Sequence, residues 1–307
     1  MIVVTGGAGF IGSNLVRLLN LSGEKNIIIV DRLNNKKKNN ISNLKFKKFL
    51  NYNYFYNNIG LFKNIKEIYH LGACTDTTKD NINTMIKKNF IYSKIIFDFA
   101  INKQIPFIYA SSAAIYGNNT NFKENIKNEK PLNIYGLSKK LFDDYVKIFL
   151  KKNESKIIGY RFFNVYGKNE KHKGNMSSVV SKNLFNNSKT INLFGKLNNL
   201  EPKNHKRDFI YVLDVVKILI WSMNNKKLQN DIYNLGTGKA QSFYNLANII
   251  KKYKPEKKIK FIKFPRELKK IYQAYTRANI EKLKKAGLKH NFLSLEEGIK
   301  DIYANKS

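Results

Sequence analysis

A tyrosine and a lysine four residues apart are the residues of this chain best suited to acid–base chemistry. Tyr135 and Lys139 stand close together in the run 133–139, and on a helix this spacing places both side chains on one face. An ammonium beside a phenol favours the phenolate, so we expect Lys139 to lower the pKa of Tyr135. Such a phenol could exchange a proton with a hydroxyl or a carbonyl. In a chain rich in Lys and Tyr the same spacing also occurs on ordinary surface helices, so neighbouring motifs must decide.

A glycine-rich turn opens the chain between an apolar strand and an apolar helix. Residues 2–5 have no polar face, and glycines follow at 6, 9 and 12 before the apolar-periodic run 13–21. We expect Gly6 to allow the tight turn, Gly9 to let a pyrophosphate approach the backbone, and Gly12 to let the helix pack on the strand. This strand–turn–helix context predicts a dinucleotide-binding turn.

Strands and helices alternate along the first half of the chain. A second apolar strand, 27–30, ends in Asp31, at about 20 residues from the glycines, where a carboxylate can bind a ribose. Further strands at 66–71, 105–110 and 157–162, with helices at 10–21, 85–102 and 135–151, predict an α/β fold with a doubly wound parallel (Rossmann) sheet. Residues 34–60 are rich in Asn and Lys and give no clear pattern.

We expect two lobes built from discontinuous segments. The dinucleotide-binding lobe comprises 1–166 and a returning segment, 209–238, with a strand from 209 to 212 and another near 232–235. A smaller C-terminal substrate-binding lobe comprises 167–208, with a helix at about 176–187, and 239–307. Its second part contains a helix at 242–253 and a final strand and helices after residue 258.

Composition narrows the class of protein. The 307 residues carry 43% apolar side chains and a net charge of +34. The lysines lie in short runs spread along the chain, together with many Asn, Ile and Tyr, so we attribute most of the charge to biased codon usage. Part of it could steer an anionic substrate. A single cysteine excludes a disulfide within the chain. No stretch reaches the roughly 20 apolar residues of a membrane helix, and no signal peptide precedes the first strand. We therefore expect a cytoplasmic protein. We also expect no bound metal, because no cluster of His, Cys, Asp or Glu has the spacing of metal ligands.

Further blocks carry a resemblance to a known family. After the strand at 105–110, the run 111–117 resembles the signature of the extended short-chain dehydrogenases/reductases that act on nucleotide sugars, and Tyr135 and Lys139 match their catalytic pair. Within that family the chain resembles the ADP-L-glycero-D-manno-heptose 6-epimerases over nearly its whole length. The blocks that carry this narrower resemblance are 72–78, 172–176, 206–209 and 272–276.

The resemblance implies an NADP-dependent isomerase that oxidises C6″ of ADP-D-glycero- or ADP-L-glycero-D-manno-heptose, a lipopolysaccharide precursor, and re-reduces it from the other face. Tyr135 would exchange the proton, and Lys139 would hold Tyr135 and the nicotinamide ribose. Ser112 would hydrogen-bond the reacting oxygen. Lys173 would be the second acid/base group.

The resemblance also implies a set of cofactor contacts. Asp31 alone suits the free ribose diol of NAD, whereas Arg32 and the lysines at 36–38 suit a 2′-phosphate; with the resemblance, we predict NADP. The expected cofactor residues are Gly6, Gly9, Phe10, Ile11, Gly12, Asp31, Arg32, Lys38, Leu71, Gly72, Ala73, Cys74, Thr75, Asn89, Lys139, Val165 and Lys173.

The substrate would lie in the second lobe. Arg207 suits a pyrophosphate, with a surface salt bridge to Asp208 or Asp214 as the alternative. The sequence departs from the family at Leu71, at 168–169, and at Lys182, where the family often has a histidine. The resemblance suggests a homo-oligomer, specifically a homopentamer, without nucleic acid or membrane partners. The expected substrate residues are Ser112, Asn164, His172, Asn175, Lys182, Phe194, Gly195, Lys196, Arg207 and Tyr272.

Two other interpretations of the protein's function stay open. One is another nucleotide-sugar enzyme, such as UDP-glucose 4-epimerase or a 4,6-dehydratase, although Ala113 and Ala114 stand where a dehydratase would have Asp and Glu. The other is a basic nucleic-acid-binding protein on a degenerate Rossmann fold, which salt-sensitive RNA binding without cofactor binding would identify.

Overall fold

The structure is a computed structural model that describes residues 1–75, 81–269 and 272–304. A seven-stranded sheet forms its centre, in the order β10-β6-β5-β4-β1-β2-β3, and every neighbouring pair is parallel. This confirms the predicted α/β fold with a parallel sheet. The strands are β1 Ile2–Thr5, β2 Ile27–Asp31, β3 Lys48–Asn51, β4 Glu67–His70, β5 Phe107–Ser112, β6 Ile157–Phe162 and β10 Asp231–Leu235.

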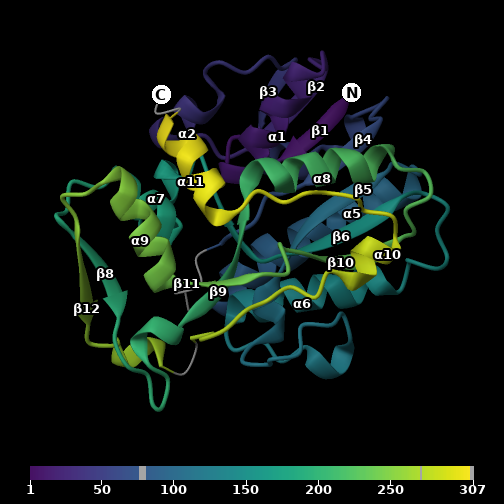
Figure 1. Ribbon diagram of the computed structural model, residues 1–307. Helices are drawn as coiled ribbons and strands as arrows, with labels where there is room; N and C mark the ends of the chain where they lie inside the picture. The colour runs from purple at the N-terminus through teal and green to yellow at the C-terminus, as the bar shows by residue number, and fades with distance from the viewer. Residues whose placement is uncertain (76–80, 270–271, 305–307) are drawn as a thin grey trace.

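Helices cover both faces of this sheet (Figure 1). On one face, α1 (Phe10–Leu21) and α8 (Val212–Asn224) pack against each other and against apolar strand residues. On the other face, α5 (Tyr92–Asn102) and α6 (Ile134–Lys147) bury an aromatic cluster with the strands. Strands buried on both faces consist of nearly uninterrupted apolar residues, which is why β1, β2 and β6 are recognisable in the sequence.

Shorter strands and helices form a second region beside the central sheet (Figure 1). Strands β7 (Asn164–Tyr166), β9 (Lys206–Tyr211) and β11 (Ala240–Ser242) make one small sheet, and β8 (Thr190–Phe194) pairs in parallel with β12 (Lys258–Ile262). Helices α7 (Val179–Phe185), α9 (Phe243–Tyr253) and α11 (Leu295–Ala304) share an apolar cluster with β7, β8, β9 and β12. The exact division into two lobes stays a prediction.

Several elements differ from the sequence predictions. Residues 34–60 contain α2 (Asn35–Ile41), β3 and α3 (Tyr52–Asn57). Only one of the four β3 residues is buried, so this edge strand lacks an apolar pattern. The long helix begins as α4 (Ile82–Met85) and passes through a π-helical stretch, Ile86–Ile91, before α5. The strand predicted at 209–212 extends back to Lys206, and Val212 already begins α8.

A short helix, α10 (Glu281–Lys285), precedes α11 near the C-terminus. Within the described residues, no helix combines the length and the apolar character required to cross a bilayer.

Candidate active site

The end of β5 and the start of α6 bring Tyr135 and Ser112 together. The Asn133 side chain caps α6 by accepting a hydrogen bond from Gly136 N at 2.8 Å. A Cβ on Gly136 would lie 2.8 Å from Ala114 O, so the helix start touches the turn that follows β5. In that turn the Ser112 hydroxyl accepts a hydrogen bond from Ala114 N at 3.1 Å. Tyr135 and Ser112 both line a cavity of about 860 Å³.

Lys139 lies buried at the same cavity, with its Nζ donating to Ala110 O at 2.8 Å. Burial lowers the pKa of Lys139 to about 8, although Asp143, one turn along α6, opposes this shift. Burial also raises the pKa of Tyr135, and the Ser112 hydroxyl offsets only part of the rise. The expectation that Lys139 lowers the pKa of Tyr135 is therefore wrong, because burial of the phenol dominates. A raised pKa favours the neutral phenol, which is a proton donor.

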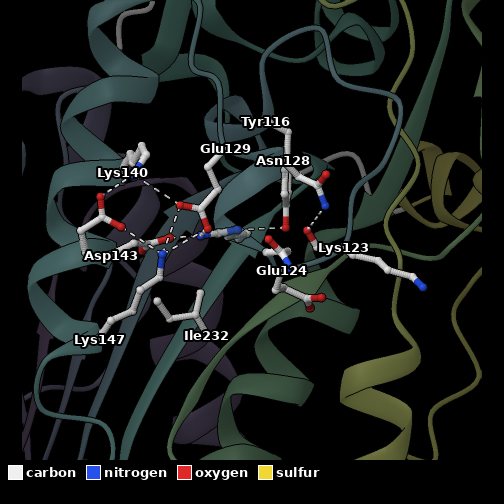
Figure 2. Close-up of polar contacts among 12 residues, drawn as sticks. Tyr116, Lys123, Glu124, Asn128, Glu129, Lys140, Asp143, Lys147 and Ile232 are labelled. Carbon is white, nitrogen blue, oxygen red and sulfur yellow. Dashed lines mark hydrogen bonds and ion pairs between the residues drawn. The ribbon is translucent and has the colours of Figure 1, made fainter.

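Asp143, one turn after Lys139 on α6, belongs to a buried ionic network (Figure 2). Asp143 accepts hydrogen bonds from Tyr109 OH and from Arg161 Nε, both at 2.9 Å. The Arg161 Nη2 also donates to Glu129 at 2.6 Å. Glu129 precedes α6 and Arg161 lies on β6, so the network joins α6 to the sheet.

The helical turn Lys171–Met176 brings a second lysine to the cavity. Lys173 Nζ lies 3.9 Å from Glu170 Oε2 and 5.2 Å from the centre of the Phe10 ring. Glu170 is buried and accepts hydrogen bonds from Gly167 N and from both Ser178 N and Oγ. Burial lowers the pKa of Lys173, an effect that Glu170 opposes and the charge of Lys182 reinforces. The site therefore combines a phenol whose pKa is raised with an amine whose pKa is lowered, a pattern typical of acid–base catalysis.

The glycine turn packs too closely on neighbouring backbone to accommodate side chains at its glycines. Gly6 adopts a φ of 68°, and a Cβ there would lie 2.7 Å from Gly72 N. A Cβ on Gly12 would lie 2.2 Å from Gly6 O, and one on Gly9 would lie 3.0 Å from the same atom. Asp31 ends β2 beside this turn and accepts a hydrogen bond from Ala8 N at 3.1 Å. A close-packed backbone turn at the start of α1, followed by a carboxylate, fits the adenosine and pyrophosphate of a dinucleotide.

The other expected cofactor residues lie in three places: beyond Asp31, around the loop after β4, and on the cavity wall. Arg32 and Lys38 are exposed beyond Asp31, whereas the neighbouring Lys37 forms an ion pair of 2.6 Å with Asp31. Asn89, in the π-helical stretch, exchanges two hydrogen bonds with the backbone of Cys74 and donates a third to Ser138. This holds the loop after β4 against α6. The cavity itself is lined by Phe10, Ile11, Leu71, Ala73, Thr75 and Val165. Residues 76–78 of the predicted block 72–78 lie outside the described residues.

Arg207 and two aromatic side chains, Phe243 and Tyr272, form a cationic and aromatic wall of the cavity. The Arg207 guanidinium lies 4.9 Å from the Tyr272 ring centre and 5.6 Å from that of Phe243. The two carboxylates considered as alternative partners of Arg207 are bound elsewhere: Asp208 by the 237–238 turn and Ala278 N, and Asp214 by His290 and Leu293 N. Asn164, Lys182, Phe194, Arg207 and Tyr272, all predicted, line the cavity.

Four predicted substrate residues are not among the residues that line this cavity: His172, Asn175, Gly195 and Lys196. Asn175 is exposed, and Lys196 pairs at the surface with Glu201. The Gly195 carbonyl meets His205 Nε2 at 3.2 Å. The His172 side chain contacts α2, with Nδ1 at 3.1 Å from Asn40 Nδ2. Substrate contact by these four residues stays a prediction.

The structure also adds residues that the sequence did not indicate. Polar side chains on α7, β8 and the loops beside them line the cavity, and their signal is only a local excess of Asn and Ser. His205 is buried and packs on Phe264 with rings 23° from parallel. The additional lining residues include Ser178, Asn183, Asn186, Asn192, His205 and Phe243.

The described residues offer no candidate metal site. Across residues 1–75, 81–269 and 272–304, no three His, Cys, Asp or Glu side chains are grouped to hold an ion. The expectation of a metal-free site stays a prediction.

Comparison with known proteins defines the class. Residues 2–236 match the profile of the NAD dependent epimerase/dehydratase family. Because this match covers more than half of the chain, the protein belongs to that family of nicotinamide-dependent enzymes.

Several solved structures are similar to this chain over almost its full length. The chain is 28% identical to ADP-L-glycero-D-manno-heptose-6-epimerase from Helicobacter pylori, with a TM-score of 0.84 over 99% of this chain and 95% of that one. It is 25% identical to UDP-glucose 4-epimerase from Thermotoga maritima, with a TM-score of 0.81 and coverages of 99% and 97%. UDP-N-acetylglucosamine 4-epimerase from Methanobrevibacter ruminantium is 24% identical, with a TM-score of 0.85 and coverages of 99% and 96%; at this identity the likeness concerns the fold.

Proposed function

We propose that this enzyme interconverts ADP-D-glycero- and ADP-L-glycero-D-manno-heptose by transient oxidation at C6″. The observation that carries the proposal is the convergence of Tyr135, Ser112 and Lys173 on one cavity. The likeness to the Helicobacter pylori heptose epimerase supports the choice of sugar. Similar fold-level likeness to UDP-sugar 4-epimerases makes those activities the second candidate.

Epimerisation of a carbinol carbon without an acidic C–H bond requires removal and return of a hydride. The glycine turn and Lys139 would hold a nicotinamide cofactor, and the chemistry that such a cofactor supplies when bound is reversible hydride acceptance. The chain must then accept the hydroxyl proton, stabilise the oxygen and return a proton. Ser112 can donate a hydrogen bond to that oxygen.

Tyr135 and Lys173 divide the proton transfers according to their environments. Burial raises the pKa of Tyr135 and lowers the pKa of Lys173. The first shift suits proton donation and the second suits proton acceptance. Two acid/base groups from separate segments allow the oxygen to exchange its proton in either orientation of the sugar. A single tyrosine would serve only one orientation well.

The wall formed by Lys182, Arg207 and Tyr272 is suited to the nucleotide. Two cations can bind the diphosphate, with Arg207 able to form paired hydrogen bonds to its oxygens. The aromatic side chains Phe194 and Tyr272 present flat apolar surface near the same wall.

The proposal includes NADP as the cofactor, because Arg32 and Lys38 are exposed beyond Asp31 and can contact a 2′-phosphate. It also includes a cytoplasmic location and a homo-oligomer, with the pentamer suggested by family resemblance. Light scattering of the purified protein would measure the oligomer size, and extraction of the bound nucleotide would identify the cofactor.

A substrate panel tests the proposed activity. Purified protein is incubated with ADP-D-glycero-D-manno-heptose, UDP-glucose or UDP-N-acetylglucosamine, and the products are separated by anion-exchange chromatography. Conversion of the heptose, lost in Tyr135→Phe, is the expected result. Conversion of either UDP-sugar without conversion of the heptose would replace the proposed substrate.

A further inference from the structure

The segment 167–178 carries Lys173, and α1 holds it from outside the cavity. Asn14 Nδ2 donates to Lys168 O at 3.1 Å, and Asn169 Nδ2 donates to Ser13 Oγ at 3.0 Å. Asn169 adopts a left-handed φ of 71°, a conformation that asparagine tolerates better than most residues. The turn at 168–169 is therefore shaped around its contacts with the dinucleotide-binding helix.

One asparagine of α2 touches both the glycine turn and the Lys173 segment. Asn40 Nδ2 lies 3.0 Å from Ala8 O, 3.3 Å from Asn169 O and 3.1 Å from His172 Nδ1. An amide NH₂ has two protons, so one can bind Ala8 O while the other is directed at the 169–172 turn. Asn40 thus joins the cofactor turn to the segment with the proposed acid/base lysine.

His172 completes this junction as a neutral ring. Burial lowers the pKa of His172 to about 4, and the charge of Lys37 contributes. In one tautomer Nδ1 accepts the hydrogen bond from Asn40; in the other it donates to Asn169 O at 3.0 Å. The first tautomer bonds the ring to α2. In the second, the imidazole bonds within its own segment, and Asn40 still reaches that segment through Asn169 O at 3.3 Å.

We propose that Asn40 and His172 are positioning residues that fasten the turn Lys171–Met176 to the dinucleotide-binding turn and so fix where Lys173 enters the cavity. The function of the junction rests on the proposed role of Lys173 as an acid/base group. The physical link itself does not depend on the substrate. Proton transfer depends steeply on geometry, and a displacement of about 1 Å can cost ~10²-fold in rate.

The first test needs no substrate. Amide hydrogen exchange across 168–178, and acetylation of Lys173 by acetic anhydride measured by mass spectrometry, are compared in wild type, Asn40→Ala and Asn39→Ala. Asn39 is the matched control because it is an exposed asparagine on the same helix. We expect faster exchange and faster acetylation in Asn40→Ala only. Unchanged exchange and acetylation in Asn40→Ala would overturn the proposal.

The second test is kinetic. Asn40→Ala should lower kcat about 10- to 100-fold with little change in KM for the nucleotide sugar. His172→Asn, which keeps an acceptor near the Nδ1 position, should retain more activity than His172→Leu. If Asn40→Ala lowers only NADP(H) affinity and leaves kcat intact, the residue serves the glycine turn alone and the proposal fails.

The two tests separate this inference from the proposed function. If wild type converts no nucleotide sugar, the function is refuted, while faster exchange in Asn40→Ala would still support the junction. If Asn40→Ala does not fold, His172→Leu breaks the same junction from the other side. Exchange of 168–178 in His172→Leu at the wild-type rate would then overturn the proposal.

Discussion

Replacing Arg161 by methionine should destabilise the fold more than any loss of a surface ion pair. The Arg161 side chain is 1% exposed and binds Asp143 at 2.9 Å and Glu129 at 2.6 Å. Its Nη1 also donates to Tyr116 OH at 3.0 Å. Figure 2 shows Glu129, Asp143 and Tyr116 within this network. Methionine fills similar space but leaves both carboxylates without their shared guanidinium.

The expected loss of stability in Arg161→Met depends on which partners each carboxylate retains. Removing one partner of a buried ion pair typically costs about 3–5 kcal/mol. Glu129 keeps Lys147 at 3.1 Å and Lys140 at 3.5 Å, whereas Asp143 keeps only the neutral Tyr109 hydroxyl among the contacts described. Because one of the two carboxylates loses its charged hydrogen-bond partner, we expect a loss within that range, about 3–5 kcal/mol.

Urea denaturation followed by circular dichroism measures this loss. Lys94→Met is the control, because it breaks a Lys94–Asp98 pair whose side chains are 39% and 32% exposed, and such pairs contribute about 0.5 kcal/mol or less. The two variants should have equal slopes in urea, which would show that the native states are comparably compact. An Arg161→Met loss no larger than that of Lys94→Met would refute the reasoning.

Acid pH provides an independent check of the same network. Burial raises the pKa of Glu129, but Arg161 and Lys147 outweigh it and hold this pKa below its usual value. A carboxylate with a depressed folded pKa stabilises the protein above its unfolded pKa, and that stabilisation is lost as pH falls through the folded value. The stability difference between wild type and Arg161→Met should therefore narrow below about pH 4. A difference that stays constant with pH would contradict this account.

Three further outcomes are expected. Tyr135→Phe and Lys173→Met should each lower kcat by about 10²–10⁴-fold with cofactor binding retained in calorimetry; wild-type turnover in Lys173→Met would remove that residue from the mechanism. Arg32→Ala should weaken NADP binding more than NAD binding, and equal losses would show that Arg32 does not contact the 2′-phosphate. Because the pKa of Lys139 is lowered to about 8, its ammonium is lost as pH rises through that value, so kcat/KM should fall above about pH 8. The residual rate of Lys139→Arg should fall only at higher pH, and an unchanged pH profile would show that another group titrates.

The elements that the sequence predicts well are those whose structure a local residue pattern determines. The apolar run before Gly6 and the glycine spacing predict β1, the turn and α1, since strand burial and close backbone packing leave direct traces in the residue types. The edge strand β3 was missed because its side chains are mostly exposed. Lys173 was predicted only through family resemblance, since its own surroundings in the sequence resemble many other lysine-rich stretches.

The electrostatics of the site depend on contacts between distant segments. The pKa of Tyr135 was predicted in the wrong direction because the spacing to Lys139 says nothing of how deeply the phenol is buried. Asp143 and Arg161 lie 18 residues apart in the chain, and no motif signals their pairing. The Asn40–His172 contact spans 132 residues and involves residue types that are abundant throughout the chain.

Transfer of the C6″ hydrogen is the most direct measure of the proposed reaction. ADP-D-glycero-D-manno-heptose deuterated at C6″ is converted to equilibrium in ordinary water, and unlabelled substrate is converted in D₂O, with both products examined by mass spectrometry and proton NMR. The proposed oxidation and re-reduction predicts that the substrate deuterium stays at C6″ and that no solvent deuterium enters that position. Deuterium gained from D₂O at C6″, or lost from the labelled substrate, would contradict hydride return and indicate proton abstraction from carbon instead.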